Sequence, residues 1–81
     1  MRLPRDLSGN DLAQALRKLG YQVTRQTGSH IRLTTPECGE HHLTIPNHNP
    51  LRVGTLFGIL ADVAEHFELS REELAGRLFG K

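Results

Sequence analysis

One histidine in this chain combines a reactive side chain with a defined local setting. The run 25–33 reads Arg-Gln-Thr-Gly-Ser-His-Ile-Arg-Leu, so a glycine–serine turn leads into an alternating strand that begins at His30. Imidazole titrates near neutral pH and suits general acid–base catalysis. In metal-free RNA cleavage, such a base removes the 2′-hydroxyl proton and the oxygen attacks the adjacent phosphorus. The alternative is a polar strand residue without a chemical role.

Other candidates for substrate binding lie around this turn and in two later segments. Ser29 could bind a phosphate oxygen or simply complete the hairpin turn. Arg25 and Arg32 flank the turn and could neutralise phosphates, although single arginines are also common on solvated strands. His48, in a turn-rich loop, is a candidate second catalytic or substrate-binding residue, and the alternative is an ordinary loop residue between two turn asparagines. The pair Gly54-Thr55 at a helix start could bind an anion through free amides, or could be an ordinary N-cap.

Four possible metal ligands lie close together in the sequence. Cys38, His41, His42 and His48 fall within eleven residues. Their spacing matches no standard zinc pattern. His41 and His42 are adjacent on an expected strand, so their side chains should point to opposite faces of the sheet. We therefore predict no metal site and no cofactor.

The elements that must position these residues follow from periodicity and capping. Ser8 with Asp11 and Ser70 with Glu73 have the spacing of helix capping boxes, and Gly20 is a natural helix stop. Apolar residues at helical spacing predict helices over about 9–19, 55–67 and 71–79. Period-two alternation between turn signals predicts strands over 21–26, 30–35 and 41–45.

The alternation also divides the strands into two faces. One face is expected to carry the apolar set Tyr21, Val23, Ile31, Leu33, Leu43 and Ile45. The other face receives the polar set Gln22, Thr24, Gln26, His30, Arg32, Thr34, His42 and Thr44. The prediction is an α+β fold of order α-β-β-β-α, with a three-stranded antiparallel sheet, helices on one face and a short third helix. Double-stranded RNA-binding domains share this topology.

Length and charge give weaker indications. The 81 residues suffice for one domain spanning 1–81, with a core of about 8–67. Residues 1–35 carry six Arg and Lys against two Asp, whereas residues 36–81 carry four against seven acidic residues. The basic front half is compatible with a phosphate-bearing partner. A lone cysteine, no secretion signal and no long apolar run favour a cytoplasmic protein without membrane contact.

The ordered motifs resemble those of a known family. Gly28-Ser29-His30, then Ile45-Pro46 with His48, then Gly54-Thr55-Leu56 followed by Ile59-Leu60 resemble the HicA toxins of toxin–antitoxin pairs, over about residues 8–66. The resemblance implies a metal-independent mRNA interferase whose active site is masked by a HicB-like antitoxin. The motif histidine is catalytic in that family, which implies that role for His30.

With that resemblance, the expected site has one catalytic residue and a set of RNA contacts. The RNA-binding candidates are Gly28, Ser29, Arg25, Arg32, His48 and Thr55, the partners are mRNA and the antitoxin, and the free protein is expected to be a monomer or small oligomer. A non-catalytic RNA-binding module and a protein-interaction domain of the same topology remain alternatives. A histidine at the hairpin favours the enzyme, because recognition of RNA shape does not require one.

Overall fold

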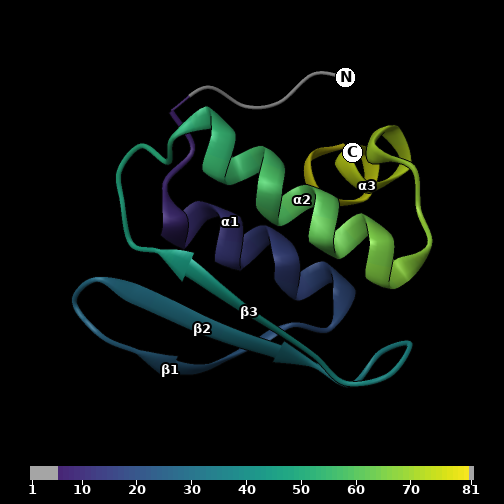
Figure 1. Ribbon diagram of the computed structural model, residues 1–81, viewed down its shortest axis with the longest axis horizontal. Helices are drawn as coiled ribbons and strands as arrows, with labels where there is room; N and C mark the ends of the chain where they lie inside the picture. The colour runs from purple at the N-terminus through teal and green to yellow at the C-terminus, as the bar shows by residue number, and fades with distance from the viewer. Residues whose placement is uncertain (1–5, 81) are drawn as a thin grey trace.

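The computed structural model describes residues 6–80 and shows three helices packed against one sheet (Figure 1). In chain order the elements are α1 (Gly9–Leu16), the 3₁₀ turn η1 (Arg17–Leu19), β1 (Gln22–Gln26), β2 (His30–Thr35), β3 (His41–Pro46), α2 (Val53–Phe67) and α3 (Arg71–Phe79). The strands form an antiparallel sheet of order β1-β2-β3. The predicted α-β-β-β-α order and the third helix are confirmed.

Both predicted capping boxes are present at helix N-termini. In α1, the Ser8 hydroxyl accepts from the Asp11 amide at 3.0 Å, and the Asp11 carboxylate accepts from the Ser8 amide at 3.1 Å. Ser70 and Glu73 make the same exchange at the start of α3, at 3.1 Å in each direction. Donation from the Ser70 backbone amide, followed by donation from the Ser70 side chain, lowers the pKa of the Glu73 carboxyl, because both favour its charged form.

Two helix boundaries differ in detail from the approximate predictions. The first α-helix ends at Leu16 rather than at residue 19, and the chain tightens into η1 before Gly20, whose φ of 85° ends it. The second long helix begins at Val53, with Arg52 in extended conformation as its N-cap and without a side-chain cap. Thr55 is therefore the third helical residue and not a cap, because the Leu56 amide already donates to the Arg52 carbonyl at 2.9 Å.

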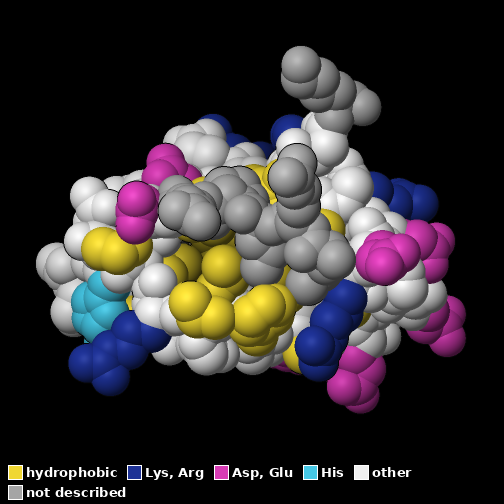
Figure 2. Space-filling model, turned by 90° about the horizontal axis from the view of Figure 1, so that it is seen from above, with side chains coloured by type: hydrophobic (Ala, Val, Ile, Leu, Met, Phe, Trp, Pro, Cys, Tyr) yellow, Lys and Arg dark blue, Asp and Glu magenta, His cyan; other side chains and the backbone are white. Residues whose placement is uncertain are grey.

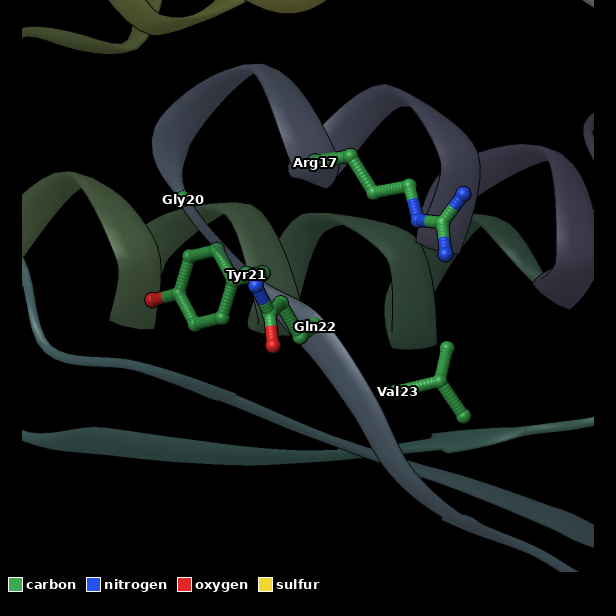
Figure 3. A pocket seen from close by; sticks show the side chains of 5 residues that line it. All are labelled: Arg17, Gly20, Tyr21, Gln22 and Val23. Atoms are coloured by element: carbon green, nitrogen blue, oxygen red, sulfur yellow. The ribbon is translucent and has the colours of Figure 1, made fainter.

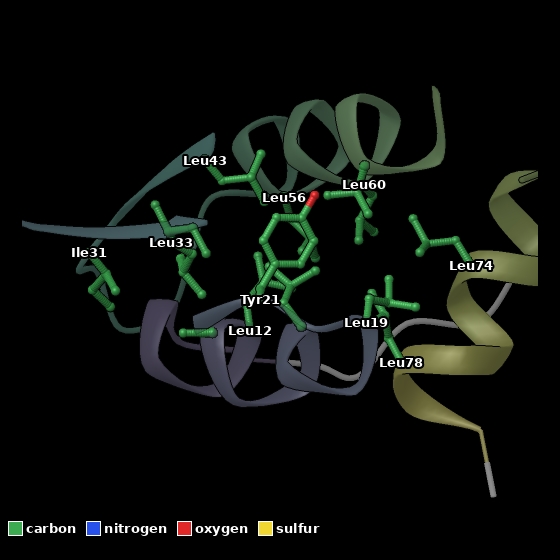
Figure 4. Packing of buried hydrophobic residues seen from close by; sticks show 14 of the residues in the cluster. Leu12, Leu19, Tyr21, Ile31, Leu33, Leu43, Leu56, Leu60, Leu74 and Leu78 are labelled. Atoms are coloured by element: carbon green, nitrogen blue, oxygen red, sulfur yellow. The ribbon is translucent and has the colours of Figure 1, made fainter. Parts of the chain in front are cut away.

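The helices cover one face of the sheet, as predicted. Figure 1 shows α1 and α2 on the same side of the strands, and no described element covers the other side. The buried cluster joins β2 and β3 to all three helices (Figure 4); its members include Leu12, Leu16, Tyr21, Ile31, Leu33, Leu43, Ile45, Leu60, Leu74 and Leu78. The third helix is thus part of the core.

The edge strand β1 departs from simple alternation. Val23 pairs with Leu33, but the next paired residue is Arg25, which lies opposite Arg32, so a β-bulge intervenes at Thr24. Gln26 consequently pairs with Ile31, whose side chain is buried, and it shares that residue's face. The predicted place of Gln26 on the polar face was wrong. Val23, expected in the core, is 39% exposed.

Candidate active site

His30 is the first residue of β2 and is exposed at the hairpin end of the sheet. Its Nδ1 lies 2.9 Å from the Ser29 hydroxyl oxygen. In the tautomer with the proton on Nδ1, that nitrogen donates to the serine oxygen. The Nε2 lone pair is then free to accept a proton from a substrate.

Backbone and threonine hydrogen bonds fix the turn that precedes His30. The Thr27 amide donates to the His30 carbonyl at 2.9 Å, and the His30 amide donates to the Thr27 hydroxyl at 3.1 Å. Gly28 has no positive φ, and no atom lies within 4 Å of the position that a Cβ would take there. Its missing side chain therefore leaves the turn open to close approach by a ligand.

Asn47 is a site residue that the sequence reasoning missed. Its amide donates to the Ser29 carbonyl at 2.9 Å, and its Nδ2 donates to the Gly28 carbonyl at 3.4 Å. Its Oδ1 accepts from Asn10 Nδ2 at 3.5 Å, which links the turn to α1. The one signal in the sequence was an asparagine directly after the last strand. Only the pairing of His30 with Pro46 shows that this asparagine meets the turn.

The structure brings some of the sequence-predicted binding residues together and separates others. Arg25 and Arg32 lie opposite each other on neighbouring strands, two residues along β2 from His30. His48 is exposed in the loop after β3, and its carbonyl accepts from the Gly9 amide at 2.9 Å. Thr55 lies in the first turn of α2, on the helix side of the sheet, and makes no hydrogen bond to the hairpin within residues 6–80.

A second group of histidines occupies the opposite end of the same strands. His41 Nδ1 lies 2.6 Å from the Tyr21 hydroxyl, its Nε2 lies 3.3 Å from Asp62, and the His66 ring stacks on it at 4.3 Å. Burial, followed by the Asp62 charge, raises the pKa of Tyr21. His42 points to the other face, as predicted, where it lies 2.8 Å from the Thr34 hydroxyl.

The described cavities lie away from His30. A shallow depression of about 300 Å³ lies where η1 leads into β1 (Figure 3) and is lined by Arg17, Gly20, Tyr21, Gln22 and Val23. Another of similar volume lies beside Cys38 and includes Lys18, Glu37 and Arg77. Neither contains a predicted catalytic or RNA-binding residue. The candidate active site lies on the open sheet face at the hairpin end, apart from both depressions.

Two other features that would bear on function are absent from the described residues. Within residues 6–80, no group of three or more His, Cys, Asp and Glu side chains is arranged to hold a metal ion. No helix in that part of the chain has the length and apolar character needed to cross a membrane.

Fold and site together define a small α+β domain with a histidine on an open polar sheet face. The chain belongs to the HicA toxin family of bacterial toxin–antitoxin systems, whose family model matches residues 9–64. That span runs from the start of α1 to the last turn of α2 and includes both His30 and His48. No curated protein and no solved structure matches the chain. The protein is thus a HicA-like toxin, and membership implies an antitoxin partner.

Proposed function

We propose that this toxin is a metal-independent endoribonuclease that cleaves mRNA, with His30 as its general acid–base residue. The observation that carries the proposal is the exposed His30 imidazole, bonded through Nδ1 to Ser29 and lying on the same open face as Arg32. The HicA family is generally associated with RNA cleavage, which supports the same chemistry.

The reaction begins when His30 Nε2 takes the proton of a ribose 2′-hydroxyl. The oxygen forms a bond to the adjacent phosphorus, and the bond from phosphorus to the 5′-oxygen breaks. The products are a 2′,3′-cyclic phosphate and a 5′-hydroxyl, once a proton reaches the leaving oxygen. His48 is the candidate donor of that proton, because the Asn47 amide donates to the Ser29 carbonyl and so holds the loop that carries His48 beside the turn.

The distribution of charge favours RNA binding at the hairpin end. Figure 2 shows acidic side chains gathered mainly at the end where α2 meets α3, a segment that includes Glu65, Glu68 and Glu72. Arg25 and Arg32 lie on the open face toward the hairpin. A polyanion is repelled from the first region and attracted to the second. Thr55 is left out of the proposed RNA contacts because of its place on the helix side.

The antitoxin is proposed to be HicB-like and to cover this open face. Masking His30 and the two arginines together would exclude RNA without any change in the toxin's fold. The measurement is protection of the hairpin from amide hydrogen exchange when the antitoxin binds. Protection confined to α2 and α3 would contradict this placement.

The deciding experiment compares induced expression of the wild type with His30→Ala, using His42→Ala as the matched control. His42 is also a histidine on the open face, but Thr34 and Glu40 occupy its ring nitrogens. We expect RNA to be degraded to cyclic-phosphate ends by the wild type and by His42→Ala, with and without a chelator, and to stay intact with His30→Ala. Intact RNA with the wild type would overturn the proposal. Loss of cleavage with chelator would overturn the metal-free mechanism.

A further inference from the structure

We propose that Arg25 and Arg32 form one composite site for a single RNA phosphate, next to the phosphate that His30 acts on. The proposal rests on the proposed function and adds a subsite to it. Arg25 of β1 lies directly opposite Arg32 of β2, and Thr44 of β3 lies opposite Arg32 on its other side. A row of two guanidinium groups and a hydroxyl therefore crosses the open face from one edge strand to the other.

The β-bulge creates this row. Val23 lies opposite Leu33, which is buried on the helix side, so regular alternation would send the Arg25 side chain to that side as well. The extra residue, Thr24, shifts the alternation by one and brings Arg25 to the face of Arg32. Bulges commonly re-aim a side chain beside a functional site.

Among the described residues, 6–80, the two arginines have no acidic partner that would give them a structural role. Like charges directly opposite each other on neighbouring strands are destabilising. The ion pairs within residues 6–80 join His41 to Asp62 and His42 to Glu40, and neither involves a guanidinium group. A phosphate bound between the arginines would remove their repulsion and could accept several charge-assisted hydrogen bonds.

The position of the row relates it to the reacting phosphate. His30 and Arg32 are two residues apart on one strand face, which is about 6.6 Å at the usual rise per residue. This is comparable to the step between neighbouring phosphates on an extended RNA strand. On the far side of the row, His42 Nε2 lies 2.9 Å from the Glu40 carboxylate, whose charge disfavours a further phosphate. The composite site therefore takes the phosphate next to the cleaved one.

The test measures binding of a short 2′-O-methyl RNA oligonucleotide, which lacks the attacking hydroxyl and cannot be cleaved by this route. Variants are Arg25→Gln, Arg32→Gln and the double change, with Arg71→Gln as an exposed control at the start of α3. Each single change should weaken binding about tenfold and reduce the slope of log affinity against log salt by about 0.7. The double change should be little weaker than either single change, because both groups hold one phosphate.

Other results decide against the site. Additive losses with a slope reduction of about 1.4 would mean two separate phosphates. If the Arg25 and Arg32 variants bind the oligonucleotide as tightly as Arg71→Gln does, the two arginines form no phosphate site. The same conclusion follows if the wild type does not bind the oligonucleotide. Cleavage assays separate the two proposals: if the wild type cleaves RNA but the arginine variants bind like the control, only the subsite fails. Circular dichroism checks folding, which removal of a like-charge pair should not weaken.

Discussion

The two ends of the β2–β3 ladder hold histidines that differ in exposure and in how many of their ring nitrogens have partners. At the end where His30 pairs with Pro46, the imidazole is exposed and, among the residues that the structure describes, is hydrogen-bonded only to its neighbour Ser29. At the end where Thr35 pairs with His41, both ring nitrogens of His41 have partners and a second imidazole covers the ring. A histidine with both nitrogens occupied holds a structure together, whereas one with a free nitrogen can exchange a proton with a substrate.

The largest expected effect separates these two histidines. His30→Ala should lower kcat for RNA cleavage by about 10²–10⁴-fold, the usual contribution of a general acid–base residue. It should change the free energy of unfolding by less than about 0.5 kcal/mol, since the side chain is exposed. His41→Ala should leave kcat nearly unchanged. It should lower the free energy of unfolding by about 1–3 kcal/mol, because it leaves the Tyr21 hydroxyl without its hydrogen-bond partner.

The measurements are single-turnover cleavage and urea unfolding of both variants. A His41→Ala variant that is folded at the assay temperature and yet inactive would contradict the purely structural role of His41. The comparison also fails if His30→Ala unfolds as readily as His41→Ala, because His30 would then have a structural role.

A glycine pair tests how firmly α1 supports the hairpin end. A Cβ on Gly9 would clash with the Pro46 carbonyl oxygen, whereas a Cβ on Gly28 would lie in open space. Gly9→Ala must displace the backbone beside Asn47 and should lower the free energy of unfolding by about 1–3 kcal/mol. Gly28→Ala should change it by less than about 0.5 kcal/mol. Equal urea midpoints for the two variants would show that α1 does not constrain this loop.

A smaller effect is expected at Asn47, which acts as a positioning residue through the Ser29 turn. Asn47→Ala keeps the backbone bond to Ser29 but loses the side-chain bond to Gly28. Displacement of His30 should lower kcat about tenfold with little change in KM. Asn10→Ala removes only the longer 3.5 Å bond to Asn47 and should have less effect on kcat. A raised KM with unchanged kcat would make Asn47 an RNA contact instead.

The smallest effect concerns pH at the His41 end. Because the pKa of Tyr21 is raised in the folded protein, its contribution to stability is fully present below about pH 10 and declines as pH rises above that value. Tyr21→Phe cannot ionise, so the advantage of the wild type over this variant in urea unfolding should shrink between pH 8 and pH 11. Tyr21 is the chain's one tyrosine, so phenolate absorbance reports its titration directly. An ordinary pKa there would contradict the buried hydrogen bond.

The sequence was sufficient where local chemistry decides the structure. Ser8 and Ser70 marked two helix starts, since a capping box is formed by residues three apart. Alternation correctly predicted that His30 and Arg32 lie on the sheet face that points away from the core, because β2 is a regular central strand. The HicA motifs then pointed to the family, which the match over residues 9–64 confirmed.

Features that depend on distant partners were missed. No residue type signals the bulge at Thr24, which is visible only when β1 is paired with β2. The part played by Asn47 depends on two turn carbonyls that lie 18 and 19 positions earlier in the chain. Tyr21 was correctly placed in the core, yet its hydroxyl partner His41 could not be inferred, because the alternation says nothing about which polar groups meet.

The third helix affects when the toxin can assemble. Leu74 and Leu78 are each 1% exposed within a cluster that also contains residues of α1, β2 and β3, and Lys18 donates to the Leu78 carbonyl at 3.0 Å. Residues 9–64 carry the family motifs, but they do not by themselves complete this core. On a translating ribosome, the helices behind the sheet therefore gain their last buried contacts, those of Leu74 and Leu78, only after α3 emerges. A nascent toxin therefore cannot bury its full core until α3 has also left the ribosome.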